Sequence, residues 1–282
     1  GRRHDRGHAG QVNAACAPRS PGSALKPFIY ALALEAGLGT PAFVVGDVPL
    51  NYRQYKPLNF SLDFLGPVSL REALVRSLNI PALRLTEQLG PARVLEEFKN
   101  LGFSTLTRPA SDYGLAVALG GGEVTLLELA NAYACLARRG LWQPVRLLED
   151  DPMPRPRRAL SEESAFLVAD MLSGDERLME LCGHAAAGAR RPVMAWKTGT
   201  SSGFRDAWTV AYNPEFVVAV WLGNPDGTPS EALVGGLAAA PWPPTSSADA
   251  TRPAAPRNSS RRPAWPCGRC AVEAAVCPGP TA

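Results

Sequence analysis

Two runs of residues, 207–212 and 216–222, constrain the fold most strongly. Both are rich in Val, Ala, Trp and Tyr, and only Asn213, Pro214 and Glu215 separate them. Apolar runs on either side of a short turn predict an antiparallel hairpin. A third run of this kind, residues 193–200, precedes them. We therefore expect an antiparallel sheet in the C-terminal half of the chain.

The residues before this sheet have helical patterns. Ser or Thr at helix starts, Pro in first turns and Gly at helix ends mark the boundaries. The expected helices are residues 23–36, 69–76, 81–89, 91–100, 125–139 and 161–172, and residues 40–67 are expected to be irregular. Helices followed by strands indicate an α+β domain in which helices pack on an antiparallel sheet.

Composition divides the chain into three parts. Residues 1–10 are polar and aperiodic, and we expect a disordered or non-native arm. Residues 11–237 form the expected domain. Residues 238–282 are rich in Pro and Ala, and we expect a disordered tail. Residue 1 is Gly rather than Met, and we expect the chain to be a fragment.

Charge and hydropathy argue against two kinds of partner. The formal net charge of +3 is too small to indicate nucleic acid, and many of the Arg residues cluster near the two ends. No apolar run approaches the roughly 20 residues of a transmembrane helix, and no signal-peptide pattern occurs. We expect neither a nucleic-acid partner nor a membrane segment in this chain.

Three cysteines near the C-terminus, Cys267, Cys270 and Cys277, resemble part of a zinc site in their spacing. No fourth Cys or His lies nearby in the sequence, so we favour the interpretation without a metal.

The chain is poor in histidine, with His4, His8 and His184 alone. Two of these lie in the N-terminal arm, which argues against a Ser-His-Asp triad or an HExxH zinc site. No phosphate-binding loop occurs either. Any nucleophile must therefore be activated by something other than imidazole.

Lysine can activate a serine in this chain. Ser23 lies at a predicted helix start and Lys26 follows three residues later. Residues at i and i+3 share one helix face, so the amine can reach the hydroxyl. A lysine whose pKa is lowered by desolvation and neighbouring cations can accept the serine proton. Alone, this S-x-x-K pattern is also common at ordinary helix starts.

Two further motifs strengthen the interpretation. Ser77 and Asn79 lie in a short gap between two predicted helices, where side chains can face a cleft. The run 197–200, Lys-Thr-Gly-Thr, ends the first predicted strand. Its glycine would let a substrate backbone approach, and its lysine and threonines could hold a carboxylate. The motifs S-x-x-K, S-x-N and K-T-G in this order are the signature of penicillin-binding proteins and class A β-lactamases.

The flanking sequence extends this resemblance over residues 11–236. The segments PGSALKPFIYALALEAG, REALVRSLNIPALRLTEQLG, ALGGGEVTLLELANAYACLARRG and KTGTSSGFRDAWTVAYNPEFVVAVWLGN resemble the transpeptidase domain of class A, bifunctional penicillin-binding proteins. The segments DVPLNYRQYKPLNFSLDFLGPVS and SSGFRDAW look closest to the 1C subtype. The implied fold is α+β of the penicillin-binding protein transpeptidase and serine β-lactamase type.

This resemblance implies a peptidoglycan DD-transpeptidase that also binds β-lactams covalently and needs no cofactor. Ser23 would attack the D-Ala–D-Ala carbonyl of a stem peptide, and the acyl group would pass to an amine or to water. The resemblance also implies a role for each motif residue: Lys26 as base, Ser77 and Lys197 in the proton relay, Asn79, Thr198, Gly199 and Thr200 in substrate binding, and the backbone N–H groups of Ser23 and Thr200 as the oxyanion hole.

The chain also departs from the family. We expect the family's glycosyltransferase domain and membrane anchor to be absent from this chain, and the first two strands of the family's five-stranded sheet to be missing. A location on the periplasmic side of the bacterial inner membrane is implied by the resemblance alone. Three alternatives stay open: a DD-carboxypeptidase, a serine β-lactamase, and a non-catalytic module that binds penicillin or peptidoglycan.

Overall fold

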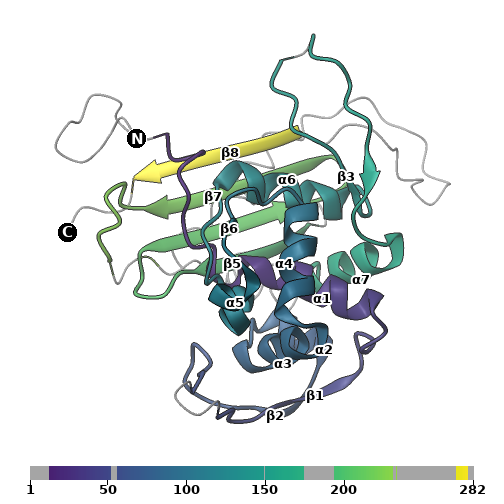
Figure 1. Ribbon diagram of the computed structural model, residues 1–282, viewed down its shortest axis with the longest axis vertical. Coiled ribbons are helices and arrows are strands. Elements are labelled where there is room, and N and C mark those ends of the chain that lie inside the picture. The colour runs from purple at the N-terminus through teal and green to yellow at the C-terminus, as the bar shows by residue number, and fades with distance from the viewer. Residues whose placement is uncertain are drawn as a thin grey trace, which may run out of the picture.

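The computed structural model describes residues 13–51, 56–148, 150–174, 194–230 and 233, together with the backbone of 271–278 (Figure 1). The cysteines at 267 and 270 and residues 1–10 lie outside this part of the chain.

The main sheet has the strand order β5-β6-β7-β8. Strands β5 (Ala195–Thr200), β6 (Asp206–Tyr212) and β7 (Phe216–Gly223) run antiparallel to one another, with Lys197 opposite Val210 and Val210 opposite Ala219. All of β6 and nearly all of β7 are buried. The predicted hairpin and the strand before it are therefore confirmed, and so is the α+β class.

Strand β8 (Ala271–Pro278) corrects the expectation of a wholly disordered tail. It pairs with β7 in parallel, from Phe216 opposite Ala271 to Gly223 opposite Pro278. Its sequence, AVEAAVCP, contains two valines, which favour strands, among alanines and a glutamate, which do not. Because prolines surround this run in the sequence, composition alone hides it. The sheet thus has four strands among the described residues, where the sequence placed three.

Helices cover the sheet and continue below it (Figure 1). Their bounds are η1 Gly22–Leu25, α1 Lys26–Glu35, α2 Leu70–Val75, α3 Asn79–Leu89, α4 Pro91–Asn100, α5 Ala110–Tyr113, η2 Gly114–Leu119, α6 Leu126–Ala137 and α7 Glu162–Leu172. All six predicted helices are present. The short α5 and η2 were not predicted from the sequence. Helices α6 and α7 pack on the sheet, and α1 contacts both α7 and α3.

Two small hairpins complete the fold. Strand β1 (Val44–Asp47) pairs with β2 (Gly66–Ser69), and β3 (Leu141–Trp142) pairs with β4 (Arg157–Arg158). The expectation that residues 40–67 are irregular was therefore wrong at both ends of that stretch. Gly and Pro within β1 and β2 interrupt the alternating pattern by which strands are found in a sequence.

The core around α1 is aromatic. Phe28 contacts Phe98, Phe103 and Tyr133 edge to face, and Tyr133 contacts Tyr212 in the same way. Such pairs add to the free energy gained from burying the rings. The cluster joins α1 to α4, α6 and β6, and so fixes α1 at the centre of the molecule.

Among the described residues, no helix is both long enough and apolar enough to cross a lipid bilayer.

Helix α6 begins with a complete capping box, and this generates a stability prediction. The Thr125 hydroxyl accepts from the Glu128 N–H, and the Glu128 carboxylate accepts from the Thr125 N–H. Thr125→Ala should lower the free energy of unfolding by about 1 kcal/mol, because it removes the cap. Urea denaturation measures this loss. Thr107→Ala, a change at an exposed threonine, is the control and should have little effect. Equal losses in both variants would contradict the prediction.

Candidate active site

The segment with Ser23 forms a 3-10 turn, η1, that leads directly into α1 at Lys26. Pro27 in the first turn of α1 suits a helix start, which lies three residues after the start at Ser23 that the sequence predicted. Ser23 is partly exposed, whereas the side chain of Lys26 is completely buried. A partly exposed hydroxyl is thus followed by an amine in the interior.

Three hydrogen bonds hold the backbone of η1 and of the residues before it in place. The Tyr133 hydroxyl on α6 donates to the carbonyl of Ala24 at 2.8 Å, and the Trp208 indole on β6 donates to the carbonyl of Ser20 at 2.8 Å. The Ser20 hydroxyl in turn donates to the carbonyl of Gly120 at 2.8 Å. Carbonyls before and after Ser23 are therefore fixed by rigid aromatic side chains.

Glycines allow η1 to touch β5. A Cβ on Gly22 would lie 2.2 Å from the Thr200 carbonyl oxygen, and one on Gly199 would lie 2.3 Å from the Pro21 carbonyl oxygen. Gly22 also has a left-handed φ of +53°. The sequence had suggested that Gly199 makes room for a substrate. The structure gives it a different reason, since β5 packs directly against the turn that carries Ser23.

Lys26 points at the loop between α2 and α3. Its Nζ donates to the Ser77 carbonyl at 2.6 Å and to the Asn79 side-chain oxygen at 2.7 Å, with the Ser77 hydroxyl at 3.5 Å. A neutral amine has two N–H donors and one lone pair. Two carbonyl acceptors at these distances can take both donors, which leaves the lone pair available as a base.

Lys197 reaches the same serine from the sheet. Its Nζ donates to the Ser77 hydroxyl at 2.7 Å and to the Thr198 carbonyl at 2.8 Å, and its side chain is completely buried. Ser77 has a φ of +58°, which non-glycine residues seldom adopt. Strain of this kind is retained where the surrounding structure requires it. Here it presents the hydroxyl of Ser77 to two lysines.

Burial sets the state of Lys26. Desolvation lowers its pKa to about 7, against a smaller opposing effect of the Asp47 carboxylate, which favours the ammonium form. Near neutral pH a substantial fraction of Lys26 is therefore the free amine.

Two further residues, Asp47 and Asn59, are linked to this site by hydrogen bonds and were not predicted from the sequence. The Asn59 amide donates to both carboxylate oxygens of Asp47 at 2.9 Å, and its oxygen accepts from the Asn79 N–H at 2.8 Å. Both residues are buried. They lie 12 residues apart in a stretch expected to be irregular, so no local spacing marks them.

Hydrogen bonds join four of the residues that the motifs predicted, Lys26, Ser77, Asn79 and Lys197, and Ser23 lies in the turn that packs on β5. Ser23 and Lys26 come from η1 and α1, Ser77 and Asn79 from the loop before α3 and its first residue, and Lys197 from β5. The other predicted residues, Thr198, Gly199 and Thr200, lie on the same strand. The described residues contain no cluster of three or more His, Cys, Asp or Glu side chains that could hold a metal.

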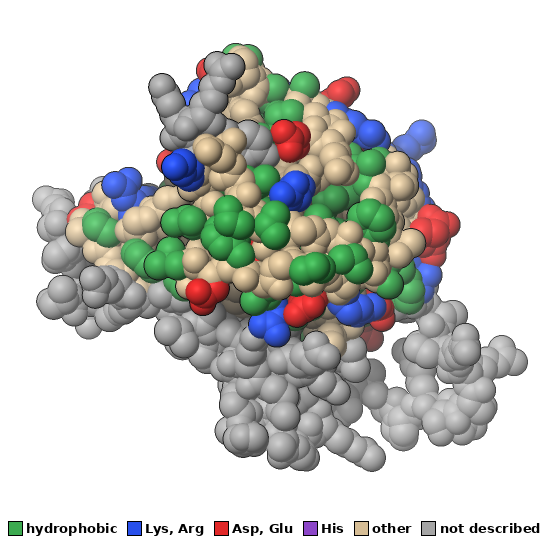
Figure 2. Space-filling model, turned by 90° about the horizontal axis from the view of Figure 1, so that it is seen from below, with side chains coloured by type: hydrophobic (Ala, Val, Ile, Leu, Met, Phe, Trp, Pro, Cys, Tyr) green, Lys and Arg blue, Asp and Glu red, His purple; other side chains and the backbone are tan. Residues whose placement is uncertain are grey.

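Apolar side chains are exposed beside the site. They lie on the β1–β2 hairpin and its loop, and the face shown in Figure 2 carries a hydrophobic patch: Phe43, Val44, Val48, Leu58, Phe60, Leu62 and Leu65. The ring of Phe60 meets that of Phe204, from the β5–β6 turn, with 6.1 Å between centroids. The two loops therefore touch through their aromatic side chains.

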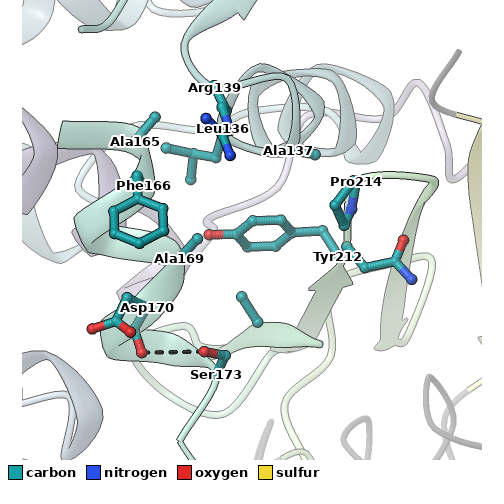
Figure 3. Close-up of a pocket in the computed structure, with 12 residues that line it drawn as sticks. Leu136, Ala137, Arg139, Ala165, Phe166, Ala169, Asp170, Ser173, Tyr212 and Pro214 are labelled. Atoms are coloured by element: carbon teal, nitrogen blue, oxygen red, sulfur yellow. Dashed lines mark hydrogen bonds between the residues drawn. The ribbon is translucent and has the colours of Figure 1, made fainter. Parts of the chain in front are cut away.

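A cavity of about 160 Å³ lies away from these residues (Figure 3). It is lined by α6, α7 and the β6–β7 turn, including Leu136, Phe166 and Tyr212. The Tyr212 hydroxyl is buried there with no hydrogen-bond partner among the described residues, and burial raises its pKa. None of the motif residues lines this cavity, so it is separate from the candidate active site.

Comparisons with known proteins agree with the geometry. Residues 5–240 match the family described as "Penicillin binding protein transpeptidase domain". Penicillin-binding protein 1C of Escherichia coli K12 is 40% identical over 235 residues, which cover 83% of this chain and 30% of that protein. Penicillin-binding protein 1A of Neisseria cinerea is 32% identical over 237 residues, which cover 74% of this chain and 28% of that protein. The chain spans less than a third of the length of these curated relatives.

A solved structure shares the fold. The penicillin-binding protein PonA1 of Mycobacterium tuberculosis, in complex with penicillin V, superposes with a TM-score of 0.69 at 23% identity. The match covers 90% of this chain and 73% of that one. At this identity the likeness shows the fold alone.

The close contact between η1 and β5 generates a second prediction. Gly22→Ala should destabilise the protein by roughly 2 kcal/mol or more, because the new methyl group collides with the Thr200 carbonyl in addition to straining the backbone. Thermal unfolding and urea denaturation measure the loss.

Gly37→Ala is the matched control. Gly37 also has a left-handed φ, +71°, but nothing lies within 4 Å of a Cβ built there. This variant should lose only about 1 kcal/mol, from backbone strain. Equal losses at the two positions would show that the contact with β5 is not as tight as described.

Proposed function

The chain belongs to the penicillin-binding protein transpeptidase family, and we propose that it forms an acyl-enzyme on Ser23 with D-Ala–D-Ala stem peptides and cross-links peptidoglycan. The observation that carries this proposal is the convergence of Lys26 and Lys197 on Ser77. We take residues 11–237 as the transpeptidase domain. We also propose that it acts on the periplasmic side of the inner membrane, as expected for a protein that builds the cell wall.

The first half of the reaction forms an ester on Ser23. The free amine of Lys26 takes the Ser23 proton as the oxygen attacks the carbonyl carbon of the penultimate D-Ala. Developing negative charge on the carbonyl oxygen would be stabilised by the backbone N–H groups of Ser23 and Thr200. The close packing of Gly22 on Thr200 supports this pairing of donors. Collapse of the intermediate breaks the peptide bond and leaves the acyl group on Ser23.

The leaving D-alanine needs a proton at its amine. Ser77 can donate its hydroxyl proton and recover one from Lys26 or Lys197, since its oxygen lies 3.5 Å and 2.7 Å from their Nζ atoms. In the second half, an amine of a neighbouring stem peptide attacks the ester and Ser23 regains its proton. Water in place of the amine gives carboxypeptidase activity.

Substrate binding would use the amide of Asn79 and residues of β5. Asn79 is partly exposed and is held at the start of α3. Thr198 and Thr200 would contact the terminal carboxylate of the stem peptide, beside the side chain of Lys197. Gly199 would keep this strand close to Ser23. A β-lactam presents a comparable carbonyl and carboxylate, so it would acylate the same serine.

Acylation of Ser23 is tested by intact-protein mass. Benzylpenicillin should add its mass to the wild-type chain and not to Ser23→Ala, because only the serine oxygen can form the ester. A stable adduct supports the transpeptidase. An adduct that forms and disappears quickly would favour a serine β-lactamase instead. A folded wild type that forms no adduct would favour a non-catalytic module and would contradict the proposal.

The buried base generates a prediction for pH dependence. Lys26 must be the free amine to accept a proton, and its pKa is lowered to about 7 by burial. The rate constant for acylation by a fluorescent penicillin should therefore rise with pH, with a midpoint near 7, and should fall about tenfold per pH unit well below it.

Lys26→Arg is the control for this profile. Arginine stays protonated throughout the range, so the variant should acylate very slowly at every pH. A wild-type rate that is flat between about pH 5.5 and 8.5 would be incompatible with Lys26 as the base.

A further inference from the structure

A buried carboxylate lies behind the two lysines and belongs to none of the three motifs. Asp47, the last residue of β1, is completely buried. Its carboxylate accepts two hydrogen bonds from the Asn59 amide and one from the Leu65 N–H, all at 2.9 Å. A buried charge is costly unless it is well hydrogen-bonded. These hydrogen bonds satisfy Asp47 and also fix the β1–β2 loop against it, and the Asn59 amide donates to the Asp63 carbonyl as well, at 2.9 Å.

Asn59 connects this carboxylate to the active site. Its oxygen accepts from the N–H of Asn79, the first residue of α3. The local N-cap residue, Leu78, has no side chain that can cap the helix. Asn59 therefore acts as a cap supplied from 20 residues away in the chain. This explains why α3 begins at Asn79, two residues before the start at Pro81 that the sequence suggested.

The cap determines where the Asn79 side chain lies. Its amide nitrogen donates to the Leu58 carbonyl at 2.7 Å, and its oxygen accepts from Lys26 Nζ at 2.7 Å. Leu58 directly precedes Asn59. The same loop thus holds both the backbone and the side chain of Asn79, and through them one of the acceptors that orient Lys26.

Charge from Asp47 also reaches Lys26. The charged and titratable groups around Lys26 are Asp47 on β1, Lys197 on β5 and Tyr30 one turn later on α1. A further cation, Arg84 of α3, lies near Asp47, because its side chain donates to the carbonyl of the adjacent Gly46. Asp47 favours the protonated form of Lys26 and opposes the larger effect of burial. Its negative charge also helps the site to tolerate two lysines that meet at one hydroxyl.

We propose that Asp47 and Asn59 are positioning residues for acylation: Asn59 holds Asn79 against Lys26, and Asp47 holds Asn59 and places a negative charge behind the base. The inference rests on the proposed function for its reaction, although the geometry and the charge effect can be measured without turnover. In this proposal the β1–β2 hairpin and its loop contribute to catalysis indirectly. Their residues position Asn79 and Lys26 and do not touch the substrate.

Two variants separate position from charge. Asp47→Asn removes the charge and offers only one acceptor oxygen to the donors of Asn59 and Leu65. The double exchange, Asp47→Asn with Asn59→Asp, returns a carboxylate to the pair and keeps a hydrogen bond between the two side chains, but position 59 no longer donates to the Asp63 carbonyl. The carboxylate now at position 59 can accept from the amide now at position 47 and from the Asn79 N–H, while the oxygen of that amide accepts from the Leu65 N–H. Asp63→Asn is the control, because it makes the same chemical change at an exposed side chain of the same loop.

The pH profile of acylation is the first measurement. Asp47→Asn should lower the plateau rate at high pH about tenfold, because Asn79 and Lys26 lose their alignment. Its midpoint should also move to lower pH by roughly 0.5 to 1, because the ammonium loses a favourable charge. The exchange variant should recover part of the plateau rate and move the midpoint back toward that of the wild type, because the negative charge is present again although the bond to the Asp63 carbonyl is lost. Asp63→Asn should change neither.

The second measurement follows Lys26 itself. The chain has four lysines, Lys26, Lys56, Lys99 and Lys197, so NMR titration with ¹³C-labelled lysine can resolve each one. Lys26→Met assigns the signal. The pKa of Lys26 should fall in Asp47→Asn and return in the exchange variant. Urea denaturation, run in parallel, identifies any variant that fails to fold.

The outcomes decide between the inference and the proposed function. A wild type that takes up no penicillin would remove the proposed function, while the NMR titration would still test the effect of Asp47 on Lys26. A wild type that is acylated, with an Asp47→Asn profile unchanged in plateau and midpoint, would overturn the inference. A loss of rate in Asp47→Asn that comes with an unchanged Lys26 pKa and no recovery in the exchange variant would also overturn it, since the pair would then serve stability alone.

Discussion

Two completely buried lysines meet at one serine hydroxyl, and much of the structure around them makes this possible. Removing an ammonium group from water is costly, and Lys26 responds with a pKa lowered to about 7. The surroundings offer acceptors in place of water: the carbonyls of Ser77 and Thr198 and the amide oxygen of Asn79. The site therefore depends on backbone and amide oxygens being held at hydrogen-bond distance in an otherwise apolar interior.

The need to hold these oxygens in place explains a strained backbone at Ser77 and two glycines at the contact between η1 and β5. Ser77 keeps a strained φ of +58°, which directs both its carbonyl and its hydroxyl at lysines. Gly22 and Gly199 have no side chain, and this allows the backbones of η1 and β5 to be in contact. The free energy for this arrangement comes from elsewhere, in particular from the aromatic cluster around Phe28 and from the buried strands β6 and β7.

Much of this could be predicted from the sequence, because its signals are local. Helix caps involve residues three or four positions apart, so the capping box of Thr125 and Glu128 can be predicted directly from the sequence. The hairpin 207–222 and the three motifs are equally compact. The pairing of Asp47 with Asn59 is different, since its geometry depends on how the loop between them folds. The same holds for β8, whose partner strand lies far earlier in the chain and whose own pattern is obscured by neighbouring prolines. The packing of Gly199 against Pro21 could not be predicted, because a sequence does not show which backbone lies against a strand.

The position of the site within the sheet follows from the same contacts. Strand β5 lies at one edge of the order β5-β6-β7-β8, and β8 lies at the other. The elements that hold the lysines, the start of α1, the start of α3 and β5, lie toward the first edge, and β6 supplies the indole that fixes the backbone before η1. The geometry of the candidate site therefore depends on contacts of η1 with β5 and of the β1–β2 loop with α3. Loops and turns make these contacts, and the directional hydrogen bonds of the buried Asp47 carboxylate restrict the conformation of the loop in a way that an apolar side chain would not.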